Sequence, residues 1–307
     1  MELLTTMTYE RDGRVARITL NRPERGNGIT LEMPSELAEC VERANLDPEV
    51  HAIALAGNGA GFCGGYDLVA SAQRMSDGFG RDDIRPGSPL DPAVQAANHD
   101  PGRVWDPVVD FQMMSRNVRG FMSLFHSEKP VVCKVHGFCV AGGTDMALCS
   151  DLLVVEDEAK IGYPPARVWG VPTTALWAWR MGPARAKRLL LTGDAMDGKT
   201  AADWGFACAS VPEVRLDSAA FALCERIARL PANQLQFMKM LVNSAVEQQG
   251  LATTQLLGTL LDGAARHTPE GREFSRAAAA DLRAAVRARD DPFGDYGSGG
   301  RTVSDPL

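Results

Sequence analysis

The sequence lacks several features that would place it in particular classes of protein. No window of about 18 apolar residues occurs, so no transmembrane helix is expected. No run of basic residues occurs and the net charge is -7, so nucleic acid is not an expected partner. No GxGxxG follows a strand-like segment, which argues against a dinucleotide-binding domain. The first residues show no apolar stretch behind a basic lead, so no signal peptide is expected.

Disulfide and metal signals are also missing. The seven cysteines are an odd number, and no CxxC pair occurs. Most of them lie in apolar surroundings, which predicts buried free thiols in a reducing compartment, and therefore a cytoplasmic protein. Cys133 and His136 lie three apart on an expected strand, so their side chains point to opposite faces. We therefore predict no metal site.

What the chain does have is glycine at turns, above all within residues 131–156. Apolar runs of strand length stand at both ends of this stretch, and Gly142 and Gly143 stand before a short apolar segment. The pattern predicts a strand, a turn, a short buried helix and another strand. Thr144 or Asp145 can lie in the first helical turn, where backbone N–H groups lack partners and attract negative charge. The alternative is a tight connection without a ligand.

A second glycine-rich turn, GNGAGFCGGYDL at 57–68, again follows an apolar strand-like run. Two such turns can each offer one backbone N–H to the same oxygen. Together they point to a site for an oxygen that becomes negatively charged.

These residues resemble the enoyl-CoA hydratase/isomerase (crotonase) superfamily. GFCGGYDL at 61–68 and VHGFCVAGGTDMALCSDLLVVEDEAKIGYPP at 135–165 are similar to its two main motifs. Residues 20–24, 192–195 and 201–205 also resemble family segments, in the family's order. The resemblance covers nearly the whole chain. It implies an α/β fold, a crotonase-like spiral of repeated ββα units with a C-terminal all-helical region.

The resemblance also implies a division of the chain. Residues 1–215 would form the spiral core, with a long irregular insertion at 71–111 that is rich in Gly, Pro and Asp. The insertion would either border the acyl pocket or form a surface elaboration. Residues 216–295 would form a helical oligomerisation region, giving a homotrimer or a dimer of trimers (a hexamer). Residues 296–307 are expected to be disordered.

Local signals place several helices. Thr30 is expected to cap a helix over 31–43, and a helical pattern returns at 112–125. Asp67 is expected to cap the helix after the first glycine-rich turn. A single helix is expected over 175–191. Amphipathic helices are expected over 217–229, 231–249 and 251–266, and Thr268-Pro269 is expected to open another that runs to about Arg289.

The implied chemistry is that of a thioester enolate. By position, the family's two oxyanion donors fall on the backbone N–H groups of Tyr66 and Gly142. Their neighbours in the chain, Gly65 and Gly143, are expected to contribute to substrate binding. Fixed donors of this kind stabilise developing negative charge. The substrate would be an acyl-CoA thioester, with no separate cofactor.

Four further residues are candidates for substrate binding. The resemblance puts Arg22 and Arg25 near the coenzyme A nucleotide, where they could meet phosphates; the alternative is a solvated loop. Tyr163 and Arg167 could face the acyl group.

The sequence departs from the family at the acid/base positions. Hydratases carry one glutamate at the position of Asp145 and another at the position of Pro165. General acid–base groups contribute roughly 10²–10⁴-fold, so the loss at Pro165 matters. Asp145 could act alone, another carboxylate such as Asp82, Asp83 or Asp110 could stand in, or the anion hole could work with a positioned water.

Two hypotheses follow. The chain is either an enoyl-CoA hydratase/isomerase-type enzyme of fatty acid metabolism, a lyase or an isomerase, or a catalytically impaired member that binds acyl-CoA or partner subunits. Pro165 favours the second hypothesis, whereas the intact turns and Asp145 favour the first.

Overall fold

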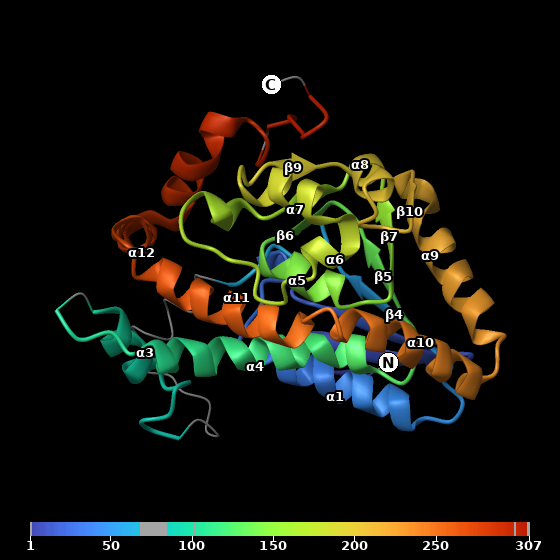
Figure 1. The fold of residues 1–307 in the computed structure, drawn as a ribbon. Coiled ribbons are helices and arrows are strands. Elements are labelled where there is room, and N and C mark those ends of the chain that lie inside the picture. Colours follow the sequence, from blue (N-terminus) through green and yellow to red (C-terminus); the bar gives the residue numbers. More distant parts are fainter. Residues whose placement is uncertain (1, 68–84, 101, 298, 306–307) are drawn as a thin grey trace.

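The computed structural model describes residues 2–67, 85–100, 102–297 and 299–305 (Figure 1). Its strands form a seven-stranded sheet in the order β1-β2-β3-β4-β5-β7-β10 and a three-stranded sheet in the order β6-β8-β9. The strands are β1 (Glu2–Leu3), β2 (Met7–Asp12), β3 (Val15–Leu20), β4 (Ala52–Gly57), β5 (Val131–Val135), β6 (Phe138–Val140), β7 (Leu152–Glu156), β8 (Lys160–Gly162), β9 (Ala195–Met196) and β10 (Ala209–Val211).

The helices cover both sheets and extend beyond them. They are α1 (Met33–Leu46), α3 (Pro92–His99), α4 (Pro107–His126), α5 (Gly142–Leu148), α6 (Trp177–Met181), α7 (Pro183–Leu190), α8 (Gly198–Asp203), α9 (Glu213–Ala228), α10 (Ala232–Glu247), α11 (Leu251–Arg266) and α12 (Pro269–Asp290). Three short 3-10 helices complete the list: η1 (Pro23–Arg25), η2 (Pro164–Arg167) and η3 (Asp291–Phe293).

The large sheet is parallel from β3 to β10, and only β1 and β2 run antiparallel to their neighbours. Pairs of strands from the two sheets alternate with helices along the chain, so the predicted spiral α/β fold is confirmed. In such a fold, the turns that leave the parallel strands gather at one edge of the sheet.

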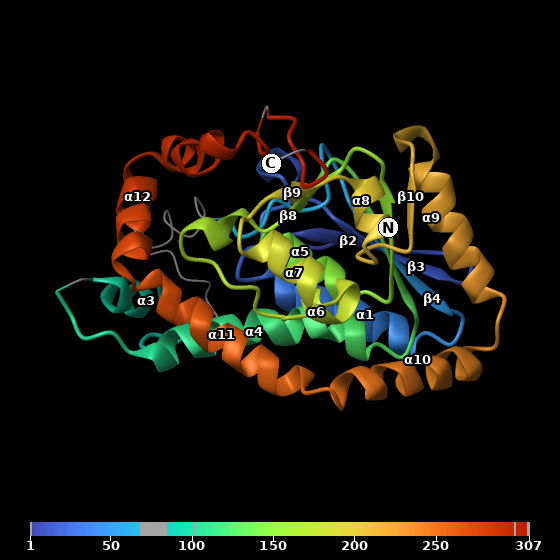
Figure 2. The same cartoon turned by 45° about the horizontal axis from the view of Figure 1, so that its top comes forward.

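Strand alternation decides which side chains enter which layer. One face of the large sheet presents Val15, Ala52, Val132 and Val154 to α9, while the other face turns side chains such as Ile18 into the main core. Figure 2 shows α9 along the outer side of the sheet and α5 on its inner side. The predicted domain boundary at 216 therefore falls inside a helix that packs on the core.

Two predicted helix boundaries are wrong. Thr30 does not cap α1: the helix begins at Met33, with Glu32 at the capping position and Pro34 in the first turn, which suits proline because its missing N–H is not needed there. The helix expected over 112–125 begins earlier, at Pro107, because Asp106 accepts a hydrogen bond from Val108 N at 2.9 Å.

The sequence predicts an irregular insertion over residues 71–111, but part of this stretch is helical. It contains α3, whose capping residue Asp91 accepts a hydrogen bond from Ala93 N at 2.8 Å, and the first turn of α4. Residues 68–84 lie outside the described part of the chain. The single helix expected over 175–191 is two helices, α6 and α7, because Gly182 (φ 78°) precedes Pro183.

The C-terminal helices follow the predicted pattern, but the tail does not. Thr268 caps α12, as the Thr-Pro pair predicts, and accepts from Gly271 N at 3.1 Å. The tail expected to be disordered packs on the core instead: Val303 N donates to Ala195 O at 2.8 Å, and the Tyr296 hydroxyl donates to Gly193 O at 3.0 Å. These two hydrogen bonds hold the described residues of the tail on the core although the composition of the tail is polar.

No helix in the described part of the chain is both long and apolar enough to cross a bilayer.

Candidate active site

The two glycine-rich turns meet at the N-terminus of α5. Isolated bridges pair Cys63 with Cys139 and Ile29 with Tyr66, which bring the first turn onto β6. Gly65 (φ 94°) is required there, because a Cβ on it would lie 2.8 Å from the Ala141 Cβ and 3.5 Å from Gly142 N. Gly143 is pressed against Cys63 in the same way, since a Cβ would lie 2.5 Å from the Cys63 O.

Two backbone donors become available at this junction. Within the described residues, the N–H groups of Tyr66 and Gly142 donate to no protein acceptor, whereas the flanking Asp67 N donates to Ile29 O at 3.0 Å. Ala141 caps α5 with φ 52°, a conformation that non-glycine residues seldom adopt and that is often found at functional sites. The junction therefore has two N–H groups without a protein acceptor among the described residues, and their role as oxyanion donors stays a prediction.

Asp145 projects from α5 into a fully buried position. Its Oδ1 accepts hydrogen bonds from Thr174 N at 3.1 Å and from Thr174 Oγ1 at 2.8 Å. Its Oδ2 is buried and has no hydrogen-bond partner among the described residues. One oxygen is thus held in place and the other is left for a reacting group.

The surroundings adjust the acidity of this carboxyl group. Burial raises the pKa of Asp145 from its ordinary value of 3.8 to about 7, the bonds from Thr174 oppose that rise, and the charge of Asp262 adds to it. A carboxyl group with a pKa near neutrality can both accept and return a proton at physiological pH.

Tyr163 and Pro165 follow β8, and the Tyr163 hydroxyl is close enough to Asp145 for the two groups to interact. Tyr163 is 3% exposed, and burial together with the Asp145 charge raises the pKa of its hydroxyl. Pro165 packs against Gly170, on which a Cβ would lie 2.3 Å from the Pro165 Cβ. The position of the family's second glutamate therefore carries no proton-transfer group.

Arg22 and Arg25 both contact Asp67. The Nη2 of Arg22 lies 2.9 Å from Asp67 Oδ2, and the Nη2 of Arg25 lies 3.4 Å from Asp67 Oδ1. The Asp67 carboxylate thus holds the two guanidinium groups of the first loop. The residues that it is expected to cap as a helix lie outside the described part of the chain, so that cap stays a prediction. Binding of phosphates by the two arginines also stays a prediction.

Arg167 does not face the site. Its guanidinium is 4% exposed and lies between Asp290 Oδ1 at 3.1 Å and Asp295 Oδ2 at 2.6 Å, while its Nε donates to Thr192 O at 3.1 Å. The ring of Phe293 covers it at 3.8 Å. The prediction that this side chain faces the acyl group is corrected: it ties the C-terminal segment to the core.

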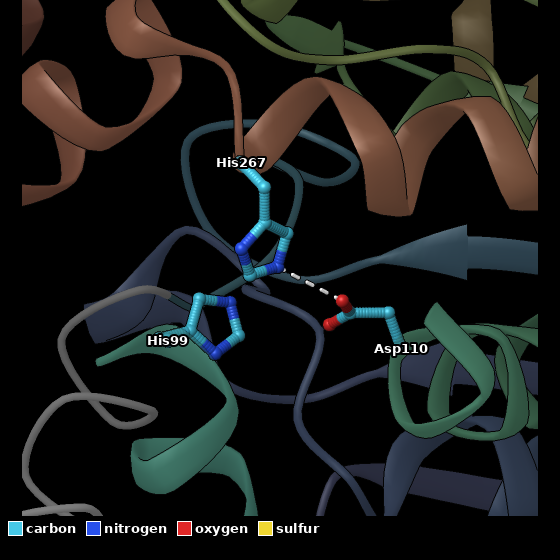
Figure 3. A group of neighbouring side chains, drawn as sticks. All are labelled: His99, Asp110 and His267. Atoms are coloured by element: carbon cyan, nitrogen blue, oxygen red, sulfur yellow. Dashed lines mark hydrogen bonds and ion pairs between the residues drawn. The ribbon is translucent and has the colours of Figure 1, made fainter. Parts of the chain in front are cut away.

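Asp110, named as a replacement carboxylate, belongs to a separate cluster with His99 and His267 (Figure 3). Its Oδ2 accepts from His267 Nε2 at 3.0 Å, Trp105 Nε1 at 2.7 Å and Asn98 Nδ2 at 3.2 Å. These are the described residues whose types and spacing could hold a metal, with ligand atoms within 4.8 Å of one another. Because one carboxylate oxygen accepts all three hydrogen bonds, the cluster connects α3, α4 and the end of α11 and has a structural role. Asp82 and Asp83 lie outside the described residues.

Two residues near Asp145 have no signal in the sequence motifs. Thr174 binds its carboxylate, and Asp262 comes from α11, where it accepts from Val171 N at 3.1 Å and pairs with Arg266. Gln255, also on α11, donates to Thr174 O at 3.0 Å. The segment 171–174 therefore joins α11 to the site, a contact that depends on how α11 packs across α4 (Figure 1).

The spiral fold and the junction of two glycine-rich turns beside a buried carboxylate define a crotonase-fold protein. Residues 10–87 and 110–271 match the family model for enoyl-CoA hydratase/isomerase. The chain therefore belongs to the enoyl-CoA hydratase/isomerase family.

Individual relatives agree with this assignment. The crystal structure of an enoyl-CoA hydratase from Mycobacterium smegmatis superposes on this chain with a TM-score of 0.90. Its sequence is 52% identical to this one, with 97% of each chain covered. An enoyl-CoA hydratase/isomerase from Xanthobacter autotrophicus Py2 is 29% identical, with 95% of this chain and 99% of that chain covered and a TM-score of 0.76. The 1,2-epoxyphenylacetyl-CoA isomerase of Escherichia coli K12 is 30% identical over 81% of this chain and 83% of its own length.

Proposed function

We propose that this chain is an acyl-CoA isomerase that moves a proton between two carbons of a thioester with Asp145 as its one acid/base. The observation that carries the proposal is the Asp145 carboxyl group, buried with Oδ1 fixed by Thr174 and Oδ2 unpaired. The relative from Escherichia coli named 1,2-epoxyphenylacetyl-CoA isomerase supports an isomerase as one activity among the relatives, although its named substrate is an epoxide.

The proposed reaction needs one carboxylate and one anion hole. Asp145 takes a proton from the α-carbon of a 3-enoyl thioester, and the electron pair moves onto the thioester oxygen. The N–H groups of Tyr66 and Gly142 hold that oxyanion, each contributing roughly 3 kcal/mol. When the carbonyl re-forms, the double bond shifts into conjugation and Asp145 returns the proton to the γ-carbon.

Hydration would ask for more than this site offers. It requires one group that activates a water at the β-carbon and a second group that donates a proton to the α-carbon. Pro165 supplies neither, and the neighbouring carboxylate of Asp262 is already occupied by Val171 N and Arg266. One carboxyl with a pKa near 7 fits a reaction that returns the proton it takes.

The direction of the absorbance change distinguishes these reactions. With a 3-enoyl-CoA, we expect conjugated thioester absorbance to appear; with the matching 2-enoyl-CoA in excess water, we expect no loss of it beyond the isomerisation equilibrium. Loss of the 2-enoyl signal beyond the isomerisation equilibrium would mean hydration and would overturn the isomerase assignment.

The second hypothesis, a catalytically impaired binding protein, rests on Pro165 alone. It would be preferred if neither thioester reacted while both bound with equal affinity to the wild type and to Asp145→Asn.

We predict that Thr174→Val shifts the pH dependence of kcat/KM. The wild type should show a rising limb with an apparent pKa of about 7, because the base form of Asp145 is required. The Thr174 hydroxyl stabilises that charged form, so its removal should raise the pKa and move the limb to higher pH, by roughly one unit. Thr173→Val is the matched control, since the Thr173 Oγ1 has no partner. A limb that moves equally in both variants would contradict the assignment.

As part of this proposal we place the enzyme in the cytoplasm with coenzyme A entering on the substrate and no separate cofactor. All seven cysteines are free, and six of them are buried, which supports a reducing compartment.

We also propose that the chain forms a homotrimer through α10 and α11. These consecutive helices expose large apolar side chains that monomers seldom leave uncovered: Phe237, Met238, Met240, Leu241, Val242, Leu256, Leu257, Leu260 and Leu261. Both helices lie along one outer side of the molecule (Figures 1 and 2).

Two lysines on this face should separate the subunits. We expect light scattering to give three times the 33.0 kDa chain mass for the wild type and one chain for Leu241→Lys with Leu257→Lys, because each lysine would be buried without a partner charge. Val214→Lys, at a more exposed position on α9, should leave the trimer intact. A wild-type monomer would refute the proposal.

A further inference from the structure

The Tyr66 side chain carries a buried hydroxyl that the described residues leave without a hydrogen bond of normal geometry. The ring lies over the N-terminus of α5, where a Cβ on Gly142 would come within 2.7 Å of Tyr66 Cε2. The Asn117 side chain lies near the hydroxyl and lowers its pKa, while burial raises that pKa more strongly. A buried donor left unpaired is unfavourable, so such atoms in native proteins call for an explanation.

Two more unpaired donors lie on the same side of the site. The Nε of Arg266 and the Nε1 of Trp169 are buried and have no partner among the described residues, and the Arg266 Cζ lies 5.4 Å from the centre of the Trp169 ring. Arg266 is close enough to Tyr66 for its charge to act on the hydroxyl. The three unpaired donors therefore come from the first turn, from the segment after η2 and from α11, and Arg266 lies near both of the others.

The charges around these donors select the kind of acceptor that fits. The Arg266 guanidinium is already paired with the Asp262 carboxylate. Asp145 adds a further acidic group on the Tyr66 side, and Asp110 adds one on the Arg266 side. An anionic acceptor would therefore meet surroundings that are not positive overall, whereas a neutral oxygen could accept the hydrogen bonds without that repulsion.

We propose that the acyl group bound here carries a neutral oxygen acceptor, such as a ketone, ether or hydroxyl oxygen, which accepts a hydrogen bond from the Tyr66 hydroxyl, with Arg266 Nε and Trp169 Nε1 as the neighbouring donors. This inference rests on the proposed function, in which the site takes an acyl-CoA thioester. A plain alkyl chain would leave all three donors unpaired. A site built around buried donors strongly disfavours a substrate analogue that lacks the acceptor.

The test compares two thioesters in two variants. The substrates are 3-enoyl-CoA thioesters of equal chain length, one with a ketone remote from the reacting double bond and one without. We expect the wild type to prefer the oxo substrate in kcat/KM, and Tyr66→Phe to reduce the oxo-to-alkyl ratio about tenfold. The ratio is the readout because the backbone N–H of residue 66 serves both substrates alike.

A matched control separates recognition from packing. Tyr9 also has a buried hydroxyl without a partner, but it lies in the core on β2, so Tyr9→Phe should leave the ratio unchanged. Removing either unpaired hydroxyl should not lower the melting temperature. An equal loss on both substrates in Tyr66→Phe, or a wild type that prefers the alkyl substrate, would overturn the proposal.

A binding measurement distinguishes this failure from failure of the proposed function. If neither thioester turns over, the isomerase assignment fails, and dissociation constants for the saturated oxo and alkyl thioesters still test the donors. Tighter binding of the oxo thioester that Tyr66→Phe abolishes would support the inference; equal binding would refute it.

Discussion

Replacing Asp145 by asparagine should lower kcat by about 10²–10⁴-fold, the contribution typical of a general acid–base group. The amide can keep its oxygen toward Thr174, so the position of the side chain is retained while the proton-transfer function is lost. Steady-state kinetics with the 3-enoyl-CoA measures the effect. Asp203→Asn, the same change at an exposed position on α8, should have normal kinetics.

The same variant should be no less stable than the wild type. The folded-state pKa of Asp145, about 7, lies above the ordinary 3.8, so the native protein binds this proton more tightly than the unfolded chain does. The stability that it contributes is present below pH 4 and is lost as the pH rises to 7. Asp145→Asn should remove that slope and should melt at an equal or higher temperature at pH 8. A kcat within threefold of the wild type would exclude Asp145 as the acid/base.

Arg167→Met should destabilise the fold by about 3–5 kcal/mol, the usual result of removing one partner from a buried ion pair. Among the described residues, the change leaves Asp295, which is 2% exposed, without a counter-charge, whereas Asp290 keeps its ion pair with Arg289. It should also release the segment after α12, since Ala195 N and Arg167 are both bound to Asp295. Urea denaturation measures the first effect, and hydrogen exchange over residues 291–305 measures the second.

Two further variants make this prediction specific. Arg188→Met removes a more exposed ion pair with Asp194 and should cost no more than about 1 kcal/mol. Adding Asp295→Asn to Arg167→Met should recover part of the lost stability, because the carboxylate that lost its counter-charge is removed as well. Equal destabilisation by Arg167→Met and Arg188→Met would show that Arg167 does not hold the tail.

Short-range patterns predicted most of the elements correctly. Thr268 before Pro269 and the spacing of apolar residues gave the C-terminal helices, since a cap and a helical stripe depend on neighbours in sequence. The same reasoning failed at Thr30, where a proline four residues on moved the helix start, and at 175–191, where Gly182 and Pro183 broke the helix. The apolar pattern also does not predict the break within α12 at Asp281 (φ -154°, ψ 98°). There the Asp281 carboxylate caps the second half of the helix by accepting a hydrogen bond from Ala284 N.

By itself, the sequence determined the type of site. Glycines at Gly65, Gly142 and Gly143 leave room for two turns to touch, and the position of Asp145 one turn into α5 follows from helical spacing. These are local requirements of backbone geometry, so they can be identified in the motifs alone.

The tertiary structure alone decided what surrounds that site. The pKa of Asp145 depends on burial, on Thr174 and on Asp262 from α11, and these lie 29 and 117 positions away in the chain. Arg167 shows the same dependence: its place in the motif suggested a substrate contact, yet carboxylates more than 120 residues later neutralise it. Electrostatic interactions and burial act through space, so a residue's chemistry is fixed only when distant segments pack against it.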